Sequence, residues 1–480
     1  MARVLFIQKQ TFFQQERIGI MQMSAVLKAQ GHGCDILILK VLTAEYLKEI
    51  LAYNPDIIAF SVMSIEADWF LEIGEQLKRA GVPSLIVAGG PHPSFFPAYL
   101  NNDCIDAINI GEGELSLLEL ADSISKGKDI STIKNLHIKR SGAIYKNDIR
   151  ALVDFNSLPF PDREMYLKYP PFKTQGTYDF LFSRGCPYTC NYCFAHQWNA
   201  LYAHHTPTRF KDVDKCIEEV VDFSKKVNVK LVYFQDSTFN LNKRWTIEFL
   251  KKYGAFVKIP FSINLRPNLV DEEVVRATAE TGCCKTVRIG IESGSERVRM
   301  EVLNKRITDK QIYEAVNLFK KYRIKMVAYV MLGLPSETFK EAWDTIYMIQ
   351  RIKPFSFSSQ IFHPYPSLRL TEYAIENGYL KREDINKVMG KDLRYYAFKS
   401  ILSQPEIEQV VNTLMVSVPA IRFPWLSHFL KFVAQRRQNM LLNVLYTISI
   451  AFMLGKQLET NFINIILQFL KINKKNKATT

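Results

Sequence analysis

Two long stretches of this chain repeat one pattern, in which a short apolar run is followed by a stretch with helical periodicity. Short apolar runs bounded by turn residues are typical of strands that are buried on both faces of a sheet. Strands that alternate with helices in this way pair in parallel, and the helices cover the faces of the sheet. The pattern therefore predicts an α/β fold.

The first stretch covers residues 1–130 and contains five such units. Its strands are expected at residues 3–8, 34–39, 56–62, 84–88 and 106–110, separated by helical stretches such as 18–30 and 67–80. Five units predict a doubly wound, Rossmann-like domain, which binds ligands at the carboxyl ends of its strands.

The second stretch covers residues 175–385 and contains six units. Its strands are expected at residues 178–183, 229–235, 261–265, 286–291, 325–332 and 355–362. Six units fit a partial (β/α)6 barrel better than a second open sheet. Polar residues that follow these strands are candidates for the active site.

Two further segments complete the predicted organisation. Residues 131–174 are expected to form a β-hairpin, with Ser141-Gly142 at its turn, and a proline-containing linker at residues 158–162. Residues 386–480 show no strand alternation and are expected to form a helical C-terminal region with a basic, amphipathic end.

The composition fits a folded protein of several domains. The chain has 480 residues, of which 48% are hydrophobic and 23% are charged. Eight cysteines are too few for a disulfide scaffold, and the apolar run Val4–Ile7 is too short for a signal peptide. We therefore expect a reducing, cytoplasmic setting, in which the cysteines are available for metals or redox chemistry.

The positive charge is concentrated at the C-terminal end. Residues 421–480 contain nine Lys or Arg residues and one acidic residue, within a net charge of +14 for the chain. Residues 441–455 are shorter than the roughly 20 apolar residues that span a bilayer, and residues 461–472 form an amphipathic pattern. Two interpretations stay open: peripheral contact with the inner face of the membrane, or a helical cap packed on the barrel. No nucleic-acid partner is expected, because these basic residues form no recognisable reading motif.

Three cysteines follow the first expected barrel strand. Cys186, Cys190 and Cys193 have the spacing CxxxCxxC. Three thiolates in one loop can hold a [4Fe–4S] cluster and leave one iron open to a further ligand. The spacing also leaves open a zinc site that adds His196. We expect the other cysteines to be structural thiols: Cys34, Cys104, Cys216, Cys283 and Cys284.

This cysteine segment resembles the cluster motif of the radical SAM superfamily, in which S-adenosylmethionine binds the fourth iron. The resemblance implies that Tyr192, just before the third cysteine, packs on the adenine of the cofactor. It also implies cofactor contacts after the later strands, at Asp236, Arg266, Glu292, Ser293 and Gly333. A zwitterionic cofactor needs partners of both charges, which the two acids and the arginine supply.

The first domain resembles the cobalamin-binding domain of one radical SAM class. Four segments carry the resemblance: Gly31-His32-Gly33, Asn54-Pro55-Asp56, Gly89-Gly90-Pro91-His92-Pro93 and Gly111-Glu112-Gly113-Glu114. It implies cobalamin contacts by Ser61, Ser64, Gly89, Gly90 and His92. The Asp-x-His-x-x-Gly signature of many such domains is absent, which implies a cobalt without a histidine ligand. We interpret His32 as a residue at the end of a helix.

The resemblance implies an enzyme that cleaves S-adenosylmethionine at a [4Fe–4S] cluster. With cobalamin, it would methylate an unactivated carbon of an apolar or secondary-metabolite substrate, such as a lipid or terpenoid. The cluster would take its electron from a donor such as a flavodoxin or ferredoxin. Two alternatives stay open: radical oxidation or cyclisation with the same cofactors, and a non-catalytic iron–sulfur or zinc-binding module at a membrane.

Overall fold

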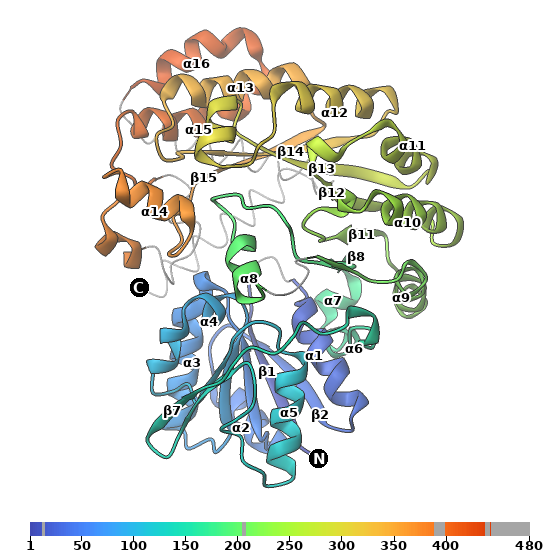
Figure 1. Cartoon of the computed structure of the whole chain (residues 1–480), viewed down its shortest axis with the longest axis vertical. Helices are drawn as coiled ribbons and strands as arrows, with labels where there is room; N and C mark the ends of the chain where they lie inside the picture. The colour runs from blue at the N-terminus through green and yellow to red at the C-terminus, as the bar shows by residue number, and fades with distance from the viewer. Residues whose placement is uncertain (12–14, 204–207, 388–398, 437–441, 443–480) are drawn as a thin grey trace.

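A computed structural model of the protein describes residues 1–11, 15–203, 208–387, 399–436 and 442. It has two α/β parts, one above the other in Figure 1, with a group of helices at the C-terminal side. This arrangement confirms the predicted α/β fold with a doubly wound sheet, a partial barrel and a helical C-terminal region.

The first part is built on a seven-stranded sheet with the order β2-β1-β3-β4-β5-β6-β7. Its strands are β1 (Arg3–Lys9), β2 (Gly33–Leu39), β3 (Ile57–Ser61), β4 (Leu85–Gly89), β5 (Ala107–Asn109), β6 (Leu136–Arg140) and β7 (Ala143–Lys146). The first five run parallel. Helices α1 (Ile18–Ala29) and α5 (Glu114–Ser125) cover one face of the sheet, and α2 (Ala44–Tyr53) and α3 (Ala67–Arg79) cover the other. The short helix α4 (Pro91–Phe95) follows β4.

The predicted hairpin is part of this sheet. Strand β6 pairs antiparallel with β5, and β7 pairs antiparallel with β6. The turn lies at Ser141 and Gly142, whose φ angles of 50° and 78° are those of a tight hairpin turn. Sequence predicted the hairpin and its turn but not the sheet edge to which it adds.

The second part is a six-stranded parallel sheet with the order β15-β14-β13-β12-β11-β8. Its strands are β8 (Thr177–Phe180), β11 (Leu231–Phe234), β12 (Phe261–Leu265), β13 (Cys284–Glu292), β14 (Met326–Leu332) and β15 (Ser356–Ile361). Its outer face carries α9 (Val213–Lys226), α10 (Lys243–Phe256), α11 (Glu272–Glu280), α12 (Asp309–Lys321) and α13 (Phe339–Ile352). The sheet curves without joining its edge strands β8 and β15, which makes it a partial barrel.

The expected strand 178–183 is interrupted in the structure. Strand β8 ends at Phe180, and a separate short strand, β9 (Ser183–Arg184), pairs antiparallel with β10 (Arg209–Phe210). The Phe182 amide and the Ser183 hydroxyl both donate to Asp236 Oδ1, at 3.1 and 2.6 Å. This carboxylate draws the chain out of the parallel ladder just before the cysteines.

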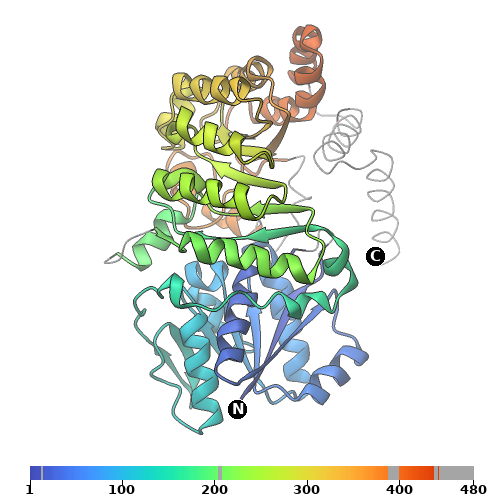
Figure 2. The ribbon, with the colours of Figure 1, turned by 90° about the vertical axis from the view of Figure 1, so that its right-hand side faces the viewer.

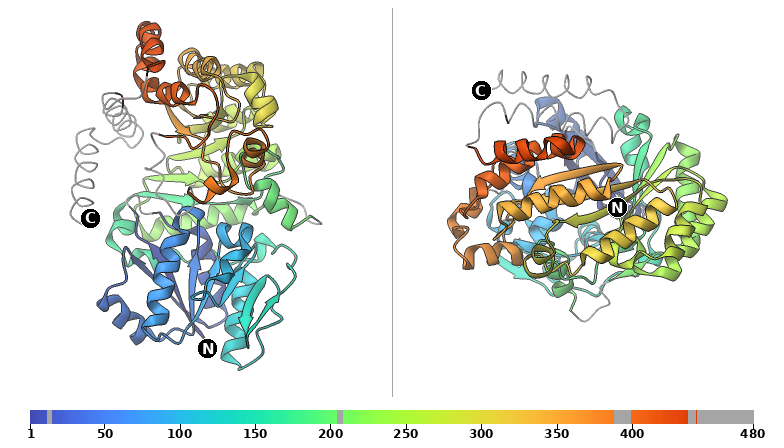
Figure 3. Two further views of the ribbon diagram at one scale, coloured as in Figure 1. Left: turned by 90° about the vertical axis from the view of Figure 1, so that its left-hand side faces the viewer. Right: turned by 90° about the horizontal axis from the view of Figure 1, so that it is seen from above.

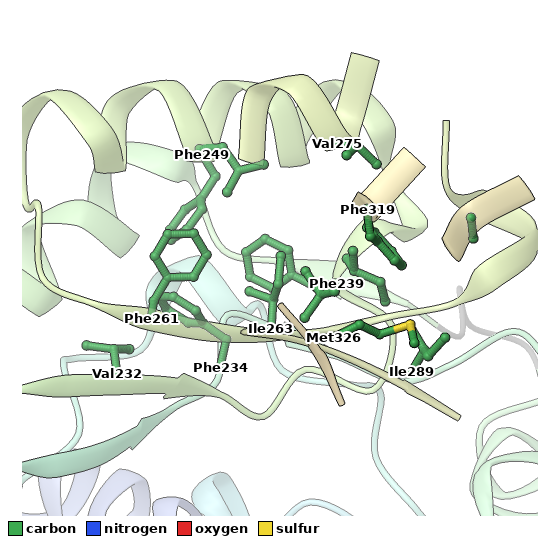
Figure 4. Packing of buried hydrophobic residues seen from close by; sticks show 14 of the residues in the cluster. Val232, Phe234, Phe239, Phe249, Phe261, Ile263, Val275, Ile289, Phe319 and Met326 are labelled. Atoms are coloured by element: carbon green, nitrogen blue, oxygen red, sulfur yellow. The ribbon is translucent and has the colours of Figure 1, made fainter. Parts of the chain in front are cut away.

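The core of the barrel lies between the sheet and its helices. Aromatic rings pack there from both sides, among them Phe234, Phe249 and Phe261, all fully buried (Figure 4). Because successive strand residues point to opposite faces, the intervening positions such as Tyr233 and Asn264 line the concave face. The barrel thus keeps an apolar outer layer and a more polar inner one.

Short elements join these parts and extend the chain. Helices α6 (Glu164–Leu167) and α7 (Pro170–Thr174) precede β8, α8 (Ala195–Leu201) follows the cysteines, and α14 (Arg369–Glu376) follows β15. One-turn helices lie at Ser64–Glu66, Pro97–Asn101, Phe155–Ser157, Phe239–Leu241, Pro267–Leu269, Arg382–Lys387 and Pro424–Leu426, and a π-helical turn at Val298–Val302.

The C-terminal helices α15 (Ile407–Arg422) and α16 (Ser427–Ala434) pack against α13 (Figure 3). The segments 441–455 and 461–472 lie outside the described residues, apart from Leu442. In the part of the chain that is described, no helix combines the length and the apolar character needed to cross a membrane.

Candidate active site

The cysteine loop runs from β9 to α8 and is held in place by its neighbours. The Asn191 amide donates to the Leu303 carbonyl at 2.9 Å, and the Asn191 carbonyl accepts from the Leu370 amide at 2.9 Å. The Asn199 side chain donates to the Cys186 carbonyl at 2.8 Å. The loop is therefore fixed between α8, the turn after Val298–Val302 and the start of α14.

The three thiols of this loop differ in exposure and are all free. Cys190 is buried, Cys186 is half-buried and Cys193 is exposed. Arg266 Nη1 lies 3.8 Å from Cys190 Sγ, and the Thr238 hydroxyl lies 3.9 Å from Cys186 Sγ. Such donors stabilise sulfur that carries negative charge, as the ligands and sulfides of a cluster do.

The zinc alternative finds no support in the structure. Among the described residues, no group of three or more His, Cys, Asp or Glu side chains could hold one metal ion. The cysteines of an iron–sulfur cluster each bind their own iron, so their sulfur atoms need not meet at one point.

Tyr192 and Glu292 come together at the mouth of the barrel with a lysine that the sequence did not single out. The Tyr192 hydroxyl donates to Glu292 Oε1 at 3.2 Å. Lys305 Nζ donates to both, at 2.7 Å to Glu292 Oε1 and 3.0 Å to the Tyr192 hydroxyl. Lys305 is 5% exposed, and nothing in its local pattern, between Asn304 and Arg306, predicts that burial.

Asp236 and Arg266 lie beside the cysteine loop, and each has an atom without a partner. Asp236 Oδ1 holds the start of the loop, whereas Oδ2 is buried without a hydrogen bond. Burial raises the pKa of Asp236 to about 6. The Arg266 guanidinium stacks on Tyr188, with 3.5 Å from Cζ to the ring centroid, and its buried Nε is also unpaired. The two residues that lie beside the cysteine loop thus each keep one buried polar atom without a protein partner, one on an acid and one on a base.

Ser293 and Gly333, the other two predicted cofactor residues, are each hydrogen-bonded to protein groups near them. Ser293 is fully buried, and its hydroxyl accepts from the Ser295 amide at 3.2 Å and lies 3.5 Å from the Thr345 hydroxyl of α13. The cofactor contact of Ser293 stays a prediction, and in this structure its hydroxyl is engaged with neighbouring protein groups. Gly333 has a φ angle of 71° and donates its amide to the Glu337 carboxyl at 2.7 Å. It shapes the loop after β14.

The predicted cobalamin residues lie at the carboxyl edge of the first sheet. Ser61 and Gly89 end β3 and β4 and are half-buried. Gly90 has a φ angle of 94°, and a Cβ atom there would lie 3.1 Å from the Val62 backbone. Small residues at the ends of parallel strands let a ligand approach the backbone closely.

Ser64 and His92 bind each other at the same edge. His92 Nδ1 lies 3.1 Å from the Ser64 hydroxyl, and its ring packs against Phe96 and Tyr99. Burial lowers the pKa of His92 to about 4, so the imidazole is neutral at physiological pH. His32 lies elsewhere, where its Nδ1 accepts from the Ala2 amide at 3.1 Å, in accord with a structural role.

The carboxyl edge of the first sheet meets the cysteine loop directly. Phe95 of α4 stacks on Phe194, the residue after Cys193, with ring centroids 4.7 Å apart. Arg184 of β9 pairs with Glu112 in the loop after β5, at 3.0 Å, and with Glu114 at the start of α5, at 2.6 Å. Figure 1 shows α4 and α8 side by side between the two parts. The carboxyl edge of the first sheet and the cysteine loop therefore lie on opposite sides of the contact between Phe95 and Phe194.

Comparison with known proteins agrees with both halves of this site. Residues 180–349 match the family model of the radical SAM superfamily, and residues 11–121 match that of the B12 binding domain. An uncharacterized methyltransferase of Pyrococcus horikoshii is 31% identical over 351 residues, which cover 70% of this chain and 73% of that protein. The chain belongs to the radical SAM superfamily, in the class with a B12-binding domain.

Two further comparisons place this radical SAM protein among its relatives. The anaerobic magnesium-protoporphyrin IX monomethyl ester cyclase of Rubrivivax gelatinosus is 24% identical over 72% of this chain and 63% of that protein. The structure of the radical S-adenosylmethionine methyltransferase TsrM from Kitasatospora setae matches with a TM-score of 0.66 and 17% identity. That match covers 79% of this chain and 76% of TsrM, and it supports the fold.

The residues present fit the cofactors of this radical SAM class, which are a [4Fe–4S] cluster, S-adenosylmethionine and cobalamin. The free thiols with their nearby donors fit a cluster. The unpaired Asp236 Oδ2 and Arg266 Nε fit a zwitterionic cofactor beside it. The half-buried Ser61, Gly89 and Gly90 fit a large ligand at the edge of the first sheet.

Proposed function

We propose that this radical SAM enzyme methylates an unactivated carbon atom of a small molecule with the help of cobalamin. The observation that carries the proposal is the stacking of Phe95 on Phe194 at 4.7 Å, which joins the edge of the B12-binding part to the cysteine loop. A methyl donor held at that edge would lie beside the site where the radical forms. The similarity to a Pyrococcus horikoshii protein named a methyltransferase supports the same activity.

Each part of the site has a distinct role in this proposal. The cofactors supply reductive cleavage of S-adenosylmethionine and transfer of the methyl group. Cys186, Cys190 and Cys193 would hold the cluster, and Asp236 and Arg266 would bind the charged end of S-adenosylmethionine.

Residues at the mouth and at the sheet edge would complete the binding site. Tyr192, Glu292 and Lys305 form one hydrogen-bonded group, which would close the mouth of the barrel around the nucleoside. Ser61 and the two glycines after β4 would contact cobalamin, and the bond between Ser64 and His92 would support that edge.

The substrate would enter the concave face of the barrel. Met326, Ala328 and Val330 of β14 face the outer core, so Tyr329 faces the inside, where it is 38% exposed. Exposed aromatic surface in this position supports a substrate with a large apolar part, such as a lipid or terpenoid. The electron would come from a flavodoxin or ferredoxin, and the net charge of +14 favours an acidic donor.

The test begins with anaerobic reconstitution of the full chain with iron, sulfide and hydroxocobalamin. We expect about four irons and one cobalamin per chain, together with release of 5′-deoxyadenosine from S-adenosylmethionine under reducing conditions. Asp236→Asn should keep the iron, because the amide oxygen can still accept from Phe182 and Ser183, but should lose most of the cleavage. Glu119→Gln, at a surface ion pair of the first part, is the matched control.

The product then separates methylation from the alternatives. Candidate apolar substrates incubated with methyl-labelled S-adenosylmethionine should gain the labelled methyl group only when cobalamin is present. An unlabelled product that has lost hydrogen would indicate oxidation or cyclisation, which the similarity to the Rubrivivax gelatinosus cyclase supports as a second candidate. Binding of zinc instead of iron, or a methylated product formed without cobalamin, would overturn the proposal.

A further inference from the structure

Four large aromatic side chains are exposed close together near the C-terminal end of the described chain. Phe423 is 47% exposed, Trp425 77%, Phe429 62% and Phe432 52%. They fall within ten residues, on the turn Pro424–Leu426 and on α16. Large apolar side chains that gather on a surface in this way mark an interaction site.

Trp425, Phe429 and Phe432 lie on the side of α16 that faces away from its buried residues. Ser427, Leu430 and Ala434 of α16 are buried in the cluster that includes α13 and α15. Trp425, Phe429 and Phe432 recur at spacings of four and three residues, which places them along one side of the helix. Figure 3 shows α16 at the outer edge of the molecule. We call these residues, with Phe423, the α16 aromatic face.

The segment that carries this face has no acidic residue of its own. No Asp or Glu occurs between Glu408 and Glu459, a stretch that includes all of the α16 aromatic face. Arg422 and Arg436 lie at the two ends of this segment and are exposed, and the Arg436 guanidinium lies 4.5 Å from the centroid of the Phe432 ring. Lys431 is directed to the packed side of α16, where its Nζ lies 5.8 Å from the centroid of the Trp343 ring of α13. A partner for this surface must accept aromatic rings and carry negative charge.

We propose that the α16 aromatic face binds the surface of a membrane that contains anionic lipid. Aromatic rings beside basic residues suit the boundary between headgroups and acyl chains, where the rings enter and the cations meet phosphates. A second copy of the chain would bring two basic surfaces together, which repel each other. This inference does not depend on the proposed methylation.

The test measures binding of the full chain to vesicles by co-sedimentation. Vesicles of phosphatidylcholine with phosphatidylglycerol should bind the protein, vesicles of phosphatidylcholine alone should bind it less, and added salt should weaken the binding. The double variant Trp425→Ser, Phe429→Ser should bind about tenfold more weakly or worse, because two exposed aromatic anchors are removed. The matched control is Phe256→Ser at the end of α10, where the ring is 71% exposed.

Four results would overturn the proposal. One is no binding of the unchanged protein to the anionic vesicles, and another is equal binding by the double variant. The third is a dimer of the unchanged protein in sedimentation equilibrium that becomes a monomer in the double variant, with no change in vesicle binding. That result would assign the face to a second copy of the chain. Equal chemical labelling of Trp425 with and without vesicles would count against lipid contact in the same way.

Discussion

Glu337 is a buried acid whose protonation is coupled to folding. It is 2% exposed, and its Oε2 accepts from the amides of Gly333 and Leu334 at 2.7 and 3.2 Å, while Oε1 has no partner. Burial raises the pKa of Glu337 from 4.5 to about 8. Between these values the folded chain keeps a proton that the unfolded chain releases. The contribution of this group to stability therefore falls as the pH rises from about 4.5 to 8.

The variant Glu337→Gln should remove this loss. An amide oxygen can still accept from the two backbone amides, and the amide cannot ionise. At pH 8 we expect a free energy of unfolding at least about 2 kcal/mol above that of the unchanged protein, and a difference that shrinks towards pH 5. Urea unfolding at four pH values between 5 and 8 measures this. Parallel pH profiles for the two proteins would contradict the assignment.

At the scale of elements, a partly buried charge network joins the loop after β5 to strands β9 and β10. Glu112 pairs with both Arg184 and Arg209, and its backbone amide donates to the Tyr202 hydroxyl at 2.8 Å. Although burial raises the pKa of Glu112, the two guanidinium groups outweigh it and hold this pKa below its ordinary value. Arg184 lies two residues before Cys186, so this network positions the start of the cysteine loop.

Replacement of Glu112 by Gln should weaken this junction strongly. Two arginines would lose their shared carboxylate in a partly buried setting, so we expect the free energy of unfolding to fall by about 3 kcal/mol. The control Glu119→Gln removes the ion pair with Arg150, in which the Glu119 side chain is 50% exposed, and should cost about 0.5 kcal/mol or less. Urea unfolding compares the two, and similar losses would show that Glu112 has no special role.

The strands were predictable because short apolar runs mark them locally. β12 matches its predicted span of residues 261–265, and most other strands agree within one or two residues at each end. The division of 178–183 into two strands was not predictable, because it depends on Asp236, more than 50 residues away. The sheet partner of the hairpin depends equally on contacts between distant segments.

Side-chain direction after a strand was harder to predict than the strand itself. The register of β13 against β14 shifts between Gly290 and Glu292, and Glu292 has a φ angle of 69°. This irregularity turns Ser293 towards α13 and leaves Glu292 at the mouth of the barrel. Lys305 joins Glu292 from a later loop, and sequence spacing carries no signal of that contact.

At the scale of the whole molecule, the two parts meet through residues that flank the cysteines rather than through the thiols. Phe194 contacts Phe95, Arg184 contacts Glu112, and Tyr202 contacts the Glu112 backbone. Gly111 makes room for this contact, because a Cβ atom there would collide with the Tyr202 hydroxyl. The two proposed cofactor sites therefore share a boundary but have no residue in common.

Loss of one cofactor should consequently leave the other bound. The triple variant Cys186→Ala, Cys190→Ala, Cys193→Ala should contain no cluster iron, yet it should bind hydroxocobalamin with an unchanged absorbance spectrum, because the flanking contacts remain. Conversely, Gly90→Ala should keep the iron and bind cobalamin more weakly, since a Cβ atom would lie 3.1 Å from the Val62 backbone at a φ angle of 94°. Iron analysis and absorbance titration of both variants measure this. If the triple variant lost cobalamin as well, the cluster itself would be needed to hold the two parts together.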